Sequence, residues 1–127
     1  MPFVNIKVAG PSLTPEQLRD LQSGATALMA EAMRKKRELT AVLVEQVPGV
    51  GWSVGAEPVQ IAAHVEAKVT HGTNTADEKA RFVAEAMGLL RTVLGPDLSP
   101  VSYVVVHEVP ADAWGYGGRT QADRARS

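Results

Sequence analysis

The chain has 127 residues, of which 45% are hydrophobic and 21% charged, as in an ordinary soluble domain with its own core. Its formal net charge of −1 argues against binding to nucleic acid or to an anionic membrane surface. The sequence has no cysteine, no signal-peptide pattern and no apolar run long enough to span a bilayer, which excludes disulfides and predicts a cytoplasmic location.

The first half of the chain predicts a strand followed by a helix. Residues 3–9 alternate in polarity, so one face of the strand is apolar. Thr14 can cap a helix, Pro15 suits its first position, and Gln17 can complete a capping box. We expect the basic run at residues 34–37 to end this helix, where positive charge complements the helix dipole.

A second strand and the whole second half follow the same plan. A strand over 39–47 leads into a glycine-rich turn around Trp52. A strand over 61–70, a helix that begins at Thr75 and ends at Gly95, and a strand over 101–106 come next. A second glycine-rich turn, residues 113–118, surrounds Trp114, and the polar residues from about Thr120 are expected to be frayed.

The two halves therefore form an internal repeat, over about residues 1–60 and 61–119, with a polar C-terminal tail in a single domain of residues 1–127. Each half is β-α-β, whose crossover makes its two strands parallel. The predicted fold is α/β (α+β), a four-stranded sheet with two helices on one face. The other face is mixed in polarity and predicts an oligomer interface lining a central channel; it carries Asn5, Lys7, Glu45, Glu66, Lys68, Tyr103 and His107.

An initial Met-Pro, a β-α-β unit of about sixty residues, and the run Glu108-Val109-Pro110 followed by Trp114-Gly115 and Gly117-Gly118 resemble the tautomerase superfamily. The chain is most similar to the fused 4-oxalocrotonate tautomerases, in which two short units share one chain. Residues 46–55 are a degraded version of the same run, and the resemblance reaches about Arg119. It implies a tautomerase/MIF-like sheet and a homotrimer of fused chains.

The resemblance also implies an activity. If Met1 is removed, Pro2 becomes a free secondary amine, and the family uses that proline as a general base. A free α-amine titrates at about 8 in model peptides, and burial would lower that value toward working pH. The expected reaction is keto–enol tautomerisation of a small 2-oxo or enol acid, without a cofactor or metal. The equivalent residue of the second half, Ala63, is internal and cannot serve.

The rest of the expected site is less complete. By the family's pairing, Trp114 would cover Pro2, and Phe3 and Val4 could complete an apolar pocket. The two arginines with which the short members hold substrate are absent, since their positions carry Ser12 and Leu13, Thr73 and Asn74, Ala41 and Tyr103. The candidates to replace them are Lys7, Arg37, Tyr103 and Arg119.

Two other functions remain open. The same Pro2 could act as an acid or nucleophile in hydration, dehalogenation or decarboxylation, or the chain could be a non-catalytic ligand-binding module. His64, His71 and His107 show no metal-ligand spacing, so no metal site is expected.

Overall fold

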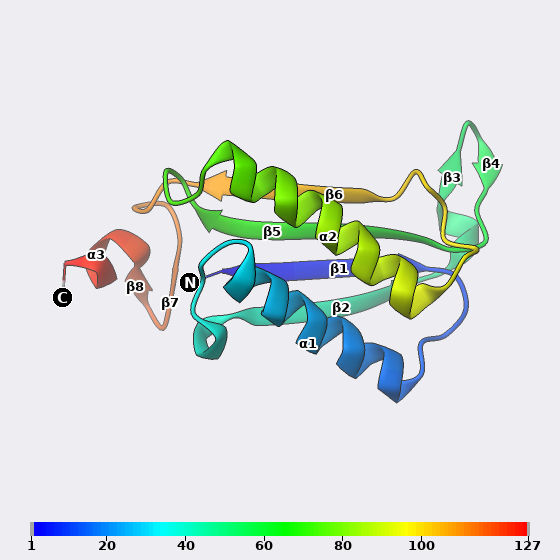
Figure 1. The fold of residues 1–127 in the computed structure, drawn as a ribbon, viewed down its shortest axis with the longest axis horizontal. Helices are drawn as coiled ribbons and strands as arrows, with labels where there is room; N and C mark the ends of the chain where they lie inside the picture. Colours follow the sequence, from blue (N-terminus) through cyan, green and yellow to red (C-terminus); the bar gives the residue numbers. More distant parts are fainter. Residues whose placement is uncertain (1, 127) are drawn as a thin grey trace.

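The computed structural model describes residues 2–126 and shows one four-stranded sheet covered by two helices (Figure 1). Its elements, in chain order, are β1 (Phe3–Ala9), α1 (Pro15–Glu31), η1 (Arg37–Leu39), β2 (Ala41–Val47), η2 (Gly49–Gly51), β3 (Ser53–Val54), β4 (Glu57–Pro58), β5 (Ala62–Thr70), α2 (Ala76–Leu94), β6 (Tyr103–Val109), β7 (Gly115–Tyr116), β8 (Arg119–Thr120) and α3 (Gln121–Ala125).

The sheet joins the two halves through their first strands. The strand order is β2-β1-β5-β6, with β1 parallel to β2 and β5 parallel to β6. The central pair, β1 and β5, is antiparallel, and Ile6 faces Val65 across it. Both α1 and α2 lie on the same face of the sheet (Figure 1). The predicted fold class is therefore confirmed, and the ends of the four main strands differ from the predicted ends by at most three residues.

The core lies between the sheet and the helices. Since side chains alternate across a strand, Val4, Ile6 and Val8 all face the helices and are buried. The helices contribute a buried stripe at helical spacing, which consists of Leu21, Ala25, Met29, Phe82, Ala86 and Leu90. The opposite face of the sheet has no helix, and Leu43 and Tyr103 are 46% and 59% exposed on it.

Both helices begin as the sequence predicts. The Thr14 hydroxyl accepts a hydrogen bond from the Gln17 N–H at 3.1 Å, and the Gln17 side chain accepts one from the Thr14 N–H at 2.9 Å. Thr75 and Glu78 make the same pair of bonds at 3.1 and 2.8 Å. Each capping box satisfies backbone N–H groups that have no partner within the helix.

The basic run does not close α1, so that prediction is wrong. The helix ends at Glu31, and its last turn contains no basic residue. Arg34 has a left-handed backbone with φ of 57°, which turns the chain away from the helix axis. The Lys35 N–H then donates to the Met29 carbonyl at 2.9 Å. The side chains of the run are thereby free to reach the second half of the chain.

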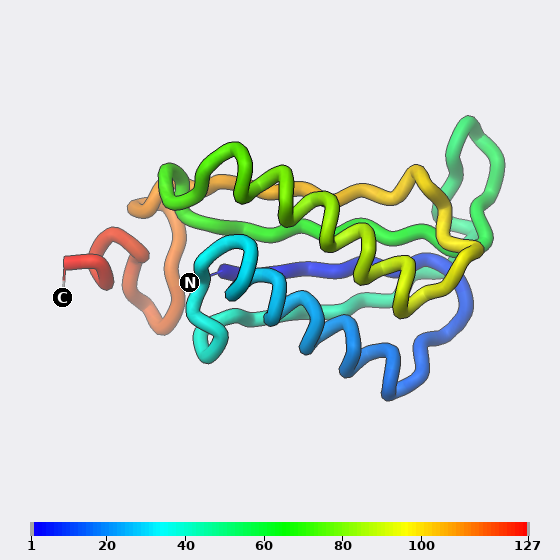
Figure 2. Tube along the Cα trace, viewed as in Figure 1, coloured from blue at the N-terminus to red at the C-terminus, as the bar shows by residue number. Residues whose placement is uncertain are grey.

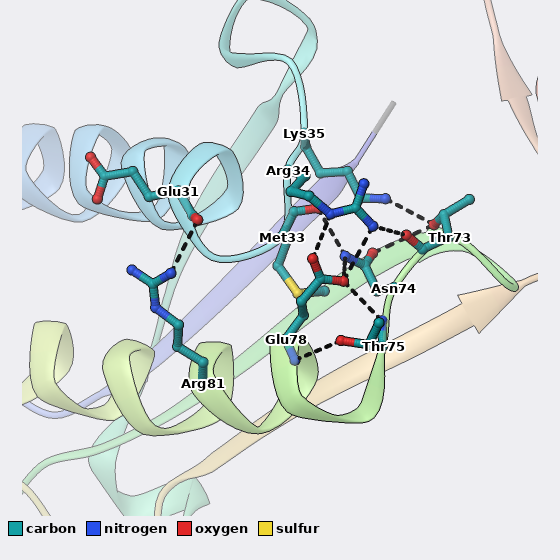
Figure 3. A network of polar contacts seen from close by, with 9 residues as sticks. All are labelled: Glu31, Met33, Arg34, Lys35, Thr73, Asn74, Thr75, Glu78 and Arg81. Atoms are coloured by element: carbon teal, nitrogen blue, oxygen red, sulfur yellow. Dashed lines mark hydrogen bonds and ion pairs between the residues drawn. The ribbon is translucent and has the colours of Figure 1, made fainter.

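Arg34 instead forms hydrogen bonds that link the first half of the chain to the second half (Figure 3). Its guanidinium donates to the Glu78 carboxylate and, at 2.9 Å, to the Thr73 carbonyl. Asn74 donates to the Met33 carbonyl at 2.9 Å and to Glu78 at 3.1 Å. The hydrogen bond from Arg34, followed by the one from the Thr75 N–H, lowers the pKa of Glu78 from 4.5 to about 2.

Residues 120–126 also adopt a defined structure, which corrects the expectation of a frayed tail. The Thr120 hydroxyl accepts from the Asp123 N–H at 3.0 Å and so caps α3. The N–H groups of Gln121 and Ala122 donate to the carbonyls of Trp114 and Ala111, each at 2.9 Å. These bonds hold α3 against the second tryptophan turn, at the same end of the sheet as the start of β1 (Figure 2).

The low pKa of Glu78 predicts a pH-dependent stability. The ionised carboxylate stabilises the fold above a pH of about 4.5, and this contribution is lost as the pH falls toward 2. The Glu78→Gln variant keeps an amide oxygen for the capping box but loses the charge. In urea denaturation we expect a lower free energy of unfolding than wild type at neutral pH, and a difference that shrinks between about pH 5 and pH 2.

Glu85→Gln is the matched control, because Glu85 is only half-buried and pairs with Arg81 of its own helix. Its effect should stay within about 0.5 kcal/mol. A Glu78→Gln difference that does not change with pH would contradict the prediction.

Candidate active site

A cleft of about 490 Å³ opens at the end of the sheet where β1 begins and β5 and β6 finish. Strand register creates it, because Phe3 lies opposite Lys68 and Lys68 opposite His107 in one row across the sheet. The second tryptophan turn and α3 close the other side. The lining residues are Phe3, Lys68, His107, Val109, Trp114, Gly115, Tyr116 and Gln121.

Pro2 enters this end of the sheet directly before Phe3. Its side chain is buried. Its carbonyl accepts a hydrogen bond from the Ala41 N–H at 3.3 Å, which continues the pairing of β1 with β2. The residue is thus fixed by the backbone of the two strands, one position from the aromatic ring that lines the cleft. Met1 lies outside the described residues.

Trp114 is held at the cleft by its own hydrogen bond. The indole N–H donates to the Thr70 hydroxyl, at the end of β5, at 3.2 Å. The ring is half-buried and lines the same cleft as Phe3. Gly115 permits the close turn, because a Cβ at that position would overlap the carbonyl oxygen of Arg119. The structure therefore brings Trp114 and the start of β1 together.

Two polar residues at the cleft were not among the predicted site residues. Lys68 Nζ lies 5.8 Å from the centroid of the Phe3 ring, and 3.8 Å from Glu66 Oε1. His107 Nδ1 lies 3.3 Å from Glu66 Oε2. Glu66 therefore stands between an ammonium and an imidazole at the cleft wall. Their strands were predicted, but only the register between the strands shows that Lys68 and His107 share a row with Phe3.

The other predicted site residues are dispersed. Lys7 pairs in register with Glu45 and His64 on the open face, and its Nζ donates to Asn5 at 2.8 Å. Tyr103 begins β6 opposite His64, so both residues lie toward the far end of the sheet from Pro2. Within one chain, neither Lys7 nor Tyr103 lies at the cleft.

Arg119, Val4 and Arg37 also lie away from the cleft lining. Arg119 lies on β8 beside Trp114, where its Nε donates to Asp123 at 2.7 Å. Val4 points into the helix-covered core with no exposed surface, so its expected place in an apolar pocket is wrong. Arg37 begins η1 and lines a separate shallow groove with Arg19.

Within residues 2–126, no three His, Asp or Glu side chains are grouped so that they could hold a metal ion. No helix of the same range is long and apolar enough to cross a membrane.

The sheet with its single helical layer, and the cleft at the start of the first strand, define a class of small proteins built from two β-α-β units. The family described as "Tautomerase enzyme" matches this chain twice, over residues 2–61 and 64–124. The chain therefore belongs to the tautomerase family.

Two known proteins with similar sequences are consistent with membership of this family. A probable tautomerase of Dickeya dadantii is 36% identical over 59 residues, which are 46% of this chain and 88% of that protein. A probable tautomerase of Campylobacter jejuni is 38% identical over 60 residues, 47% of this chain and 88% of that protein. About half of this chain therefore matches nearly the full length of each relative.

Solved structures share the whole fold. A fused 4-OT asymmetric trimer superposes with a TM-score of 0.80 at 21% identity, covering 97% of this chain and 98% of its own. A macrophage migration inhibitory factor-like protein from Entamoeba histolytica gives a TM-score of 0.74 at 18% identity, covering 94% and 97%. At these identities the likeness establishes the fold alone.

The tight turn after Trp114 generates a testable prediction. Gly115→Ala forces the added Cβ against the backbone of Arg119 and Thr120, which cannot move as a side-chain end can. We expect a loss of about 1 to 3 kcal/mol in the free energy of unfolding and a changed near-UV circular dichroism signal from Trp114.

Gly51→Ala in the first tryptophan turn is the control, since a Cβ there meets nothing within 4 Å. Equal effects of the two substitutions would show that the backbone contact at Gly115 does not matter.

Proposed function

We propose that the protein is a proline-dependent keto–enol tautomerase that acts on a small 2-oxo or enol acid, with Pro2 as the general base after removal of Met1. The observation that supports it most is the apolar cleft at the start of β1, where Phe3, Lys68 and Trp114 meet one residue from Pro2. Family membership supports the reaction class.

The chemistry follows from the groups at this end of the sheet. The neutral amine of Pro2 removes a proton from a carbon next to the substrate carbonyl; the electron pair of that C–H bond forms a carbon–carbon double bond, and the π electron pair of the carbonyl moves to its oxygen. The protonated amine then returns the proton to another atom of the same substrate. Such a cycle conserves atoms and charge and requires no cofactor.

Lys68 is our proposed replacement for the missing arginines. An enolate develops negative charge on oxygen, and a preorganised cation beside it supplies the largest part of many catalytic effects. Lys68 lines the cleft, lies opposite Phe3 in the sheet, and is oriented by Glu66. The same ammonium can bind the substrate carboxylate, which makes it a binding residue as well as a catalytic one.

We further propose a homotrimer of these fused chains. The open face of the sheet leaves Leu43 and Tyr103 exposed, although each is a large hydrophobic side chain. Several structurally similar fused 4-OT proteins are trimers. In a trimer, residues of this face in a neighbouring chain, such as Tyr103 or Lys7, would be able to approach a Pro2 site.

Replacing Pro2 tests the proposed base. The intact mass of the protein should be short by one methionine. Pro2→Ala should lower kcat/KM for a 2-oxo acid by about 100-fold or more, because general base catalysis contributes about 10² to 10⁴. Pro58→Ala, in the exposed strand β4, should leave the rate unchanged.

The pH profile separates the base from the acid role of Pro2. With Pro2 as base, the rate rises as the amine loses its proton; with Pro2 as acid, the rate falls over the same range. A full-length mass, or a fully active Pro2→Ala variant, would refute the proposed mechanism.

Replacing Lys68 tests the proposed electrophile. Lys68→Gln removes the charge and should lower kcat by about 100- to 1000-fold, the range for loss of an oxyanion partner. Lys68→Arg should restore part of that loss, and Arg91→Gln, an exposed charge on α2, should have no effect. A Lys68→Gln variant whose kcat is normal would exclude Lys68 from the chemistry.

A further inference from the structure

A second cleft, also of about 490 Å³, adjoins the first at the same end of the molecule. Its walls come from four segments: the loop between α1 and η1 with Leu39, the end of β5 with the loop that follows, the segment from Ala111 to Tyr116, and α3. Tyr116 and Gln121 line both clefts, so the two share a wall.

The charge of this second cleft is one-sided. Among the residues that the structure describes, its lining includes Arg34, Lys35, Lys36 and Arg124 and no aspartate or glutamate, although the Arg34 guanidinium is paired with the Glu78 carboxylate. The chain as a whole has a net charge of −1, so this concentration of positive charge is local. A cavity lined by cations with no carboxylate among the lining residues favours an anionic occupant.

Several of these cations are held in place by the fold. Lys35 Nζ donates to the Thr73 hydroxyl at 2.8 Å, and Arg34 donates to the Thr73 carbonyl at 2.9 Å (Figure 3). The Arg124 guanidinium lies 3.8 Å from the centroid of the Tyr116 ring. Preorganised donors of this kind lose little conformational entropy when a ligand binds.

The crowding of the cations also costs free energy at Lys35, and the nearby Glu78 carboxylate offsets that cost only in part. Burial lowers the pKa of Lys35, and the neighbouring charge of Arg34 lowers it further. Both effects destabilise the charged form of the Lys35 side chain. A bound anion would offset both.

We propose that this basic cleft binds the phosphate group of a small molecule. A phosphate carries about two negative charges and three terminal oxygens, so it can accept hydrogen bonds from several directions at once. The cations here come from two segments, since Arg34, Lys35 and Lys36 lie in the loop after α1 and Arg124 lies on α3. A single carboxylate offers two oxygens in one plane and would engage fewer of them.

The second cleft adjoins the proposed active site, but the phosphate proposal does not depend on the chemistry proposed for that site. The Thr70 hydroxyl lines the basic cleft and accepts the hydrogen bond of the Trp114 indole. A phosphate bound beside Thr70 changes the surroundings of Trp114. The site could therefore be present and filled even if Pro2 were not a base, and the two proposals can fail separately.

Calorimetric titration of the full-length protein with inorganic phosphate tests the proposal directly. Wild type should bind phosphate more tightly than acetate, with an affinity that falls as salt is added. Lys35→Gln combined with Lys36→Gln should weaken phosphate binding by about tenfold or more for each charge removed, and Lys35→Arg with Lys36→Arg should retain it.

Arg19→Gln combined with Arg37→Gln is the matched control. These two residues line the separate groove of about 490 Å³, so the control removes the same net charge from a cavity of equal size elsewhere. Its phosphate affinity should equal that of wild type. A loss as large as that of the lysine pair would show a non-specific charge effect and would overturn the proposal.

Fluorescence adds a readout that locates the bound phosphate. The chain has two tryptophans, so Trp52→Phe leaves Trp114 as the single reporter. Phosphate should change its emission with the same dissociation constant as in calorimetry. Absence of phosphate binding to the wild-type protein, tighter binding of acetate, or binding without any response of Trp114 would each overturn the proposed site.

Discussion

The antiparallel pairing of β1 with β5 is the constraint on which the rest of the structure depends. A single β-α-β half exposes the edge of its first strand and cannot cover its own sheet. When the two first strands pair, Ile6 faces Val65 and both helices come to one face, where they bury a common core. The same pairing places Phe3 opposite Lys68, so the register that completes the core also assembles the cleft.

The pairing gives the two ends of the sheet the same arrangement of elements but different residues. Because β1 and β5 run in opposite directions, the turn that follows each half lies beside the start of the other half. Trp114 thus meets the start of β1, at Phe3. The equivalent position in the second half, Ala63, is a buried strand residue with backbone on both sides. Of the two ends, only the one at which β1 begins also carries α3 and the basic loop after α1.

The site shows why residue types alone do not identify neighbours. Lys7 and Lys68 are both lysines on the open face of the sheet, and Lys7 lies near the amino terminus in the sequence. Yet Lys7 pairs with Glu45 and His64, whereas Lys68 lies across from Phe3. The predicted strands contain both residues, and the choice between them depends on register, which is set by contacts between segments about sixty residues apart.

The sequence by itself determined what depends on neighbours along the chain. Strand alternation, two capping boxes, the repeat and the tryptophan turns are local patterns, and each is present in the structure. Only the tertiary structure decided the role of the basic run, whose Arg34 binds Glu78 of the other half instead of its own helix. It also decided that the polar tail forms α3, since the carbonyls of Ala111 and Trp114 accept its first N–H groups. Both outcomes depend on hydrogen-bond partners distant along the chain or in another element, and a local pattern carries no information about those partners.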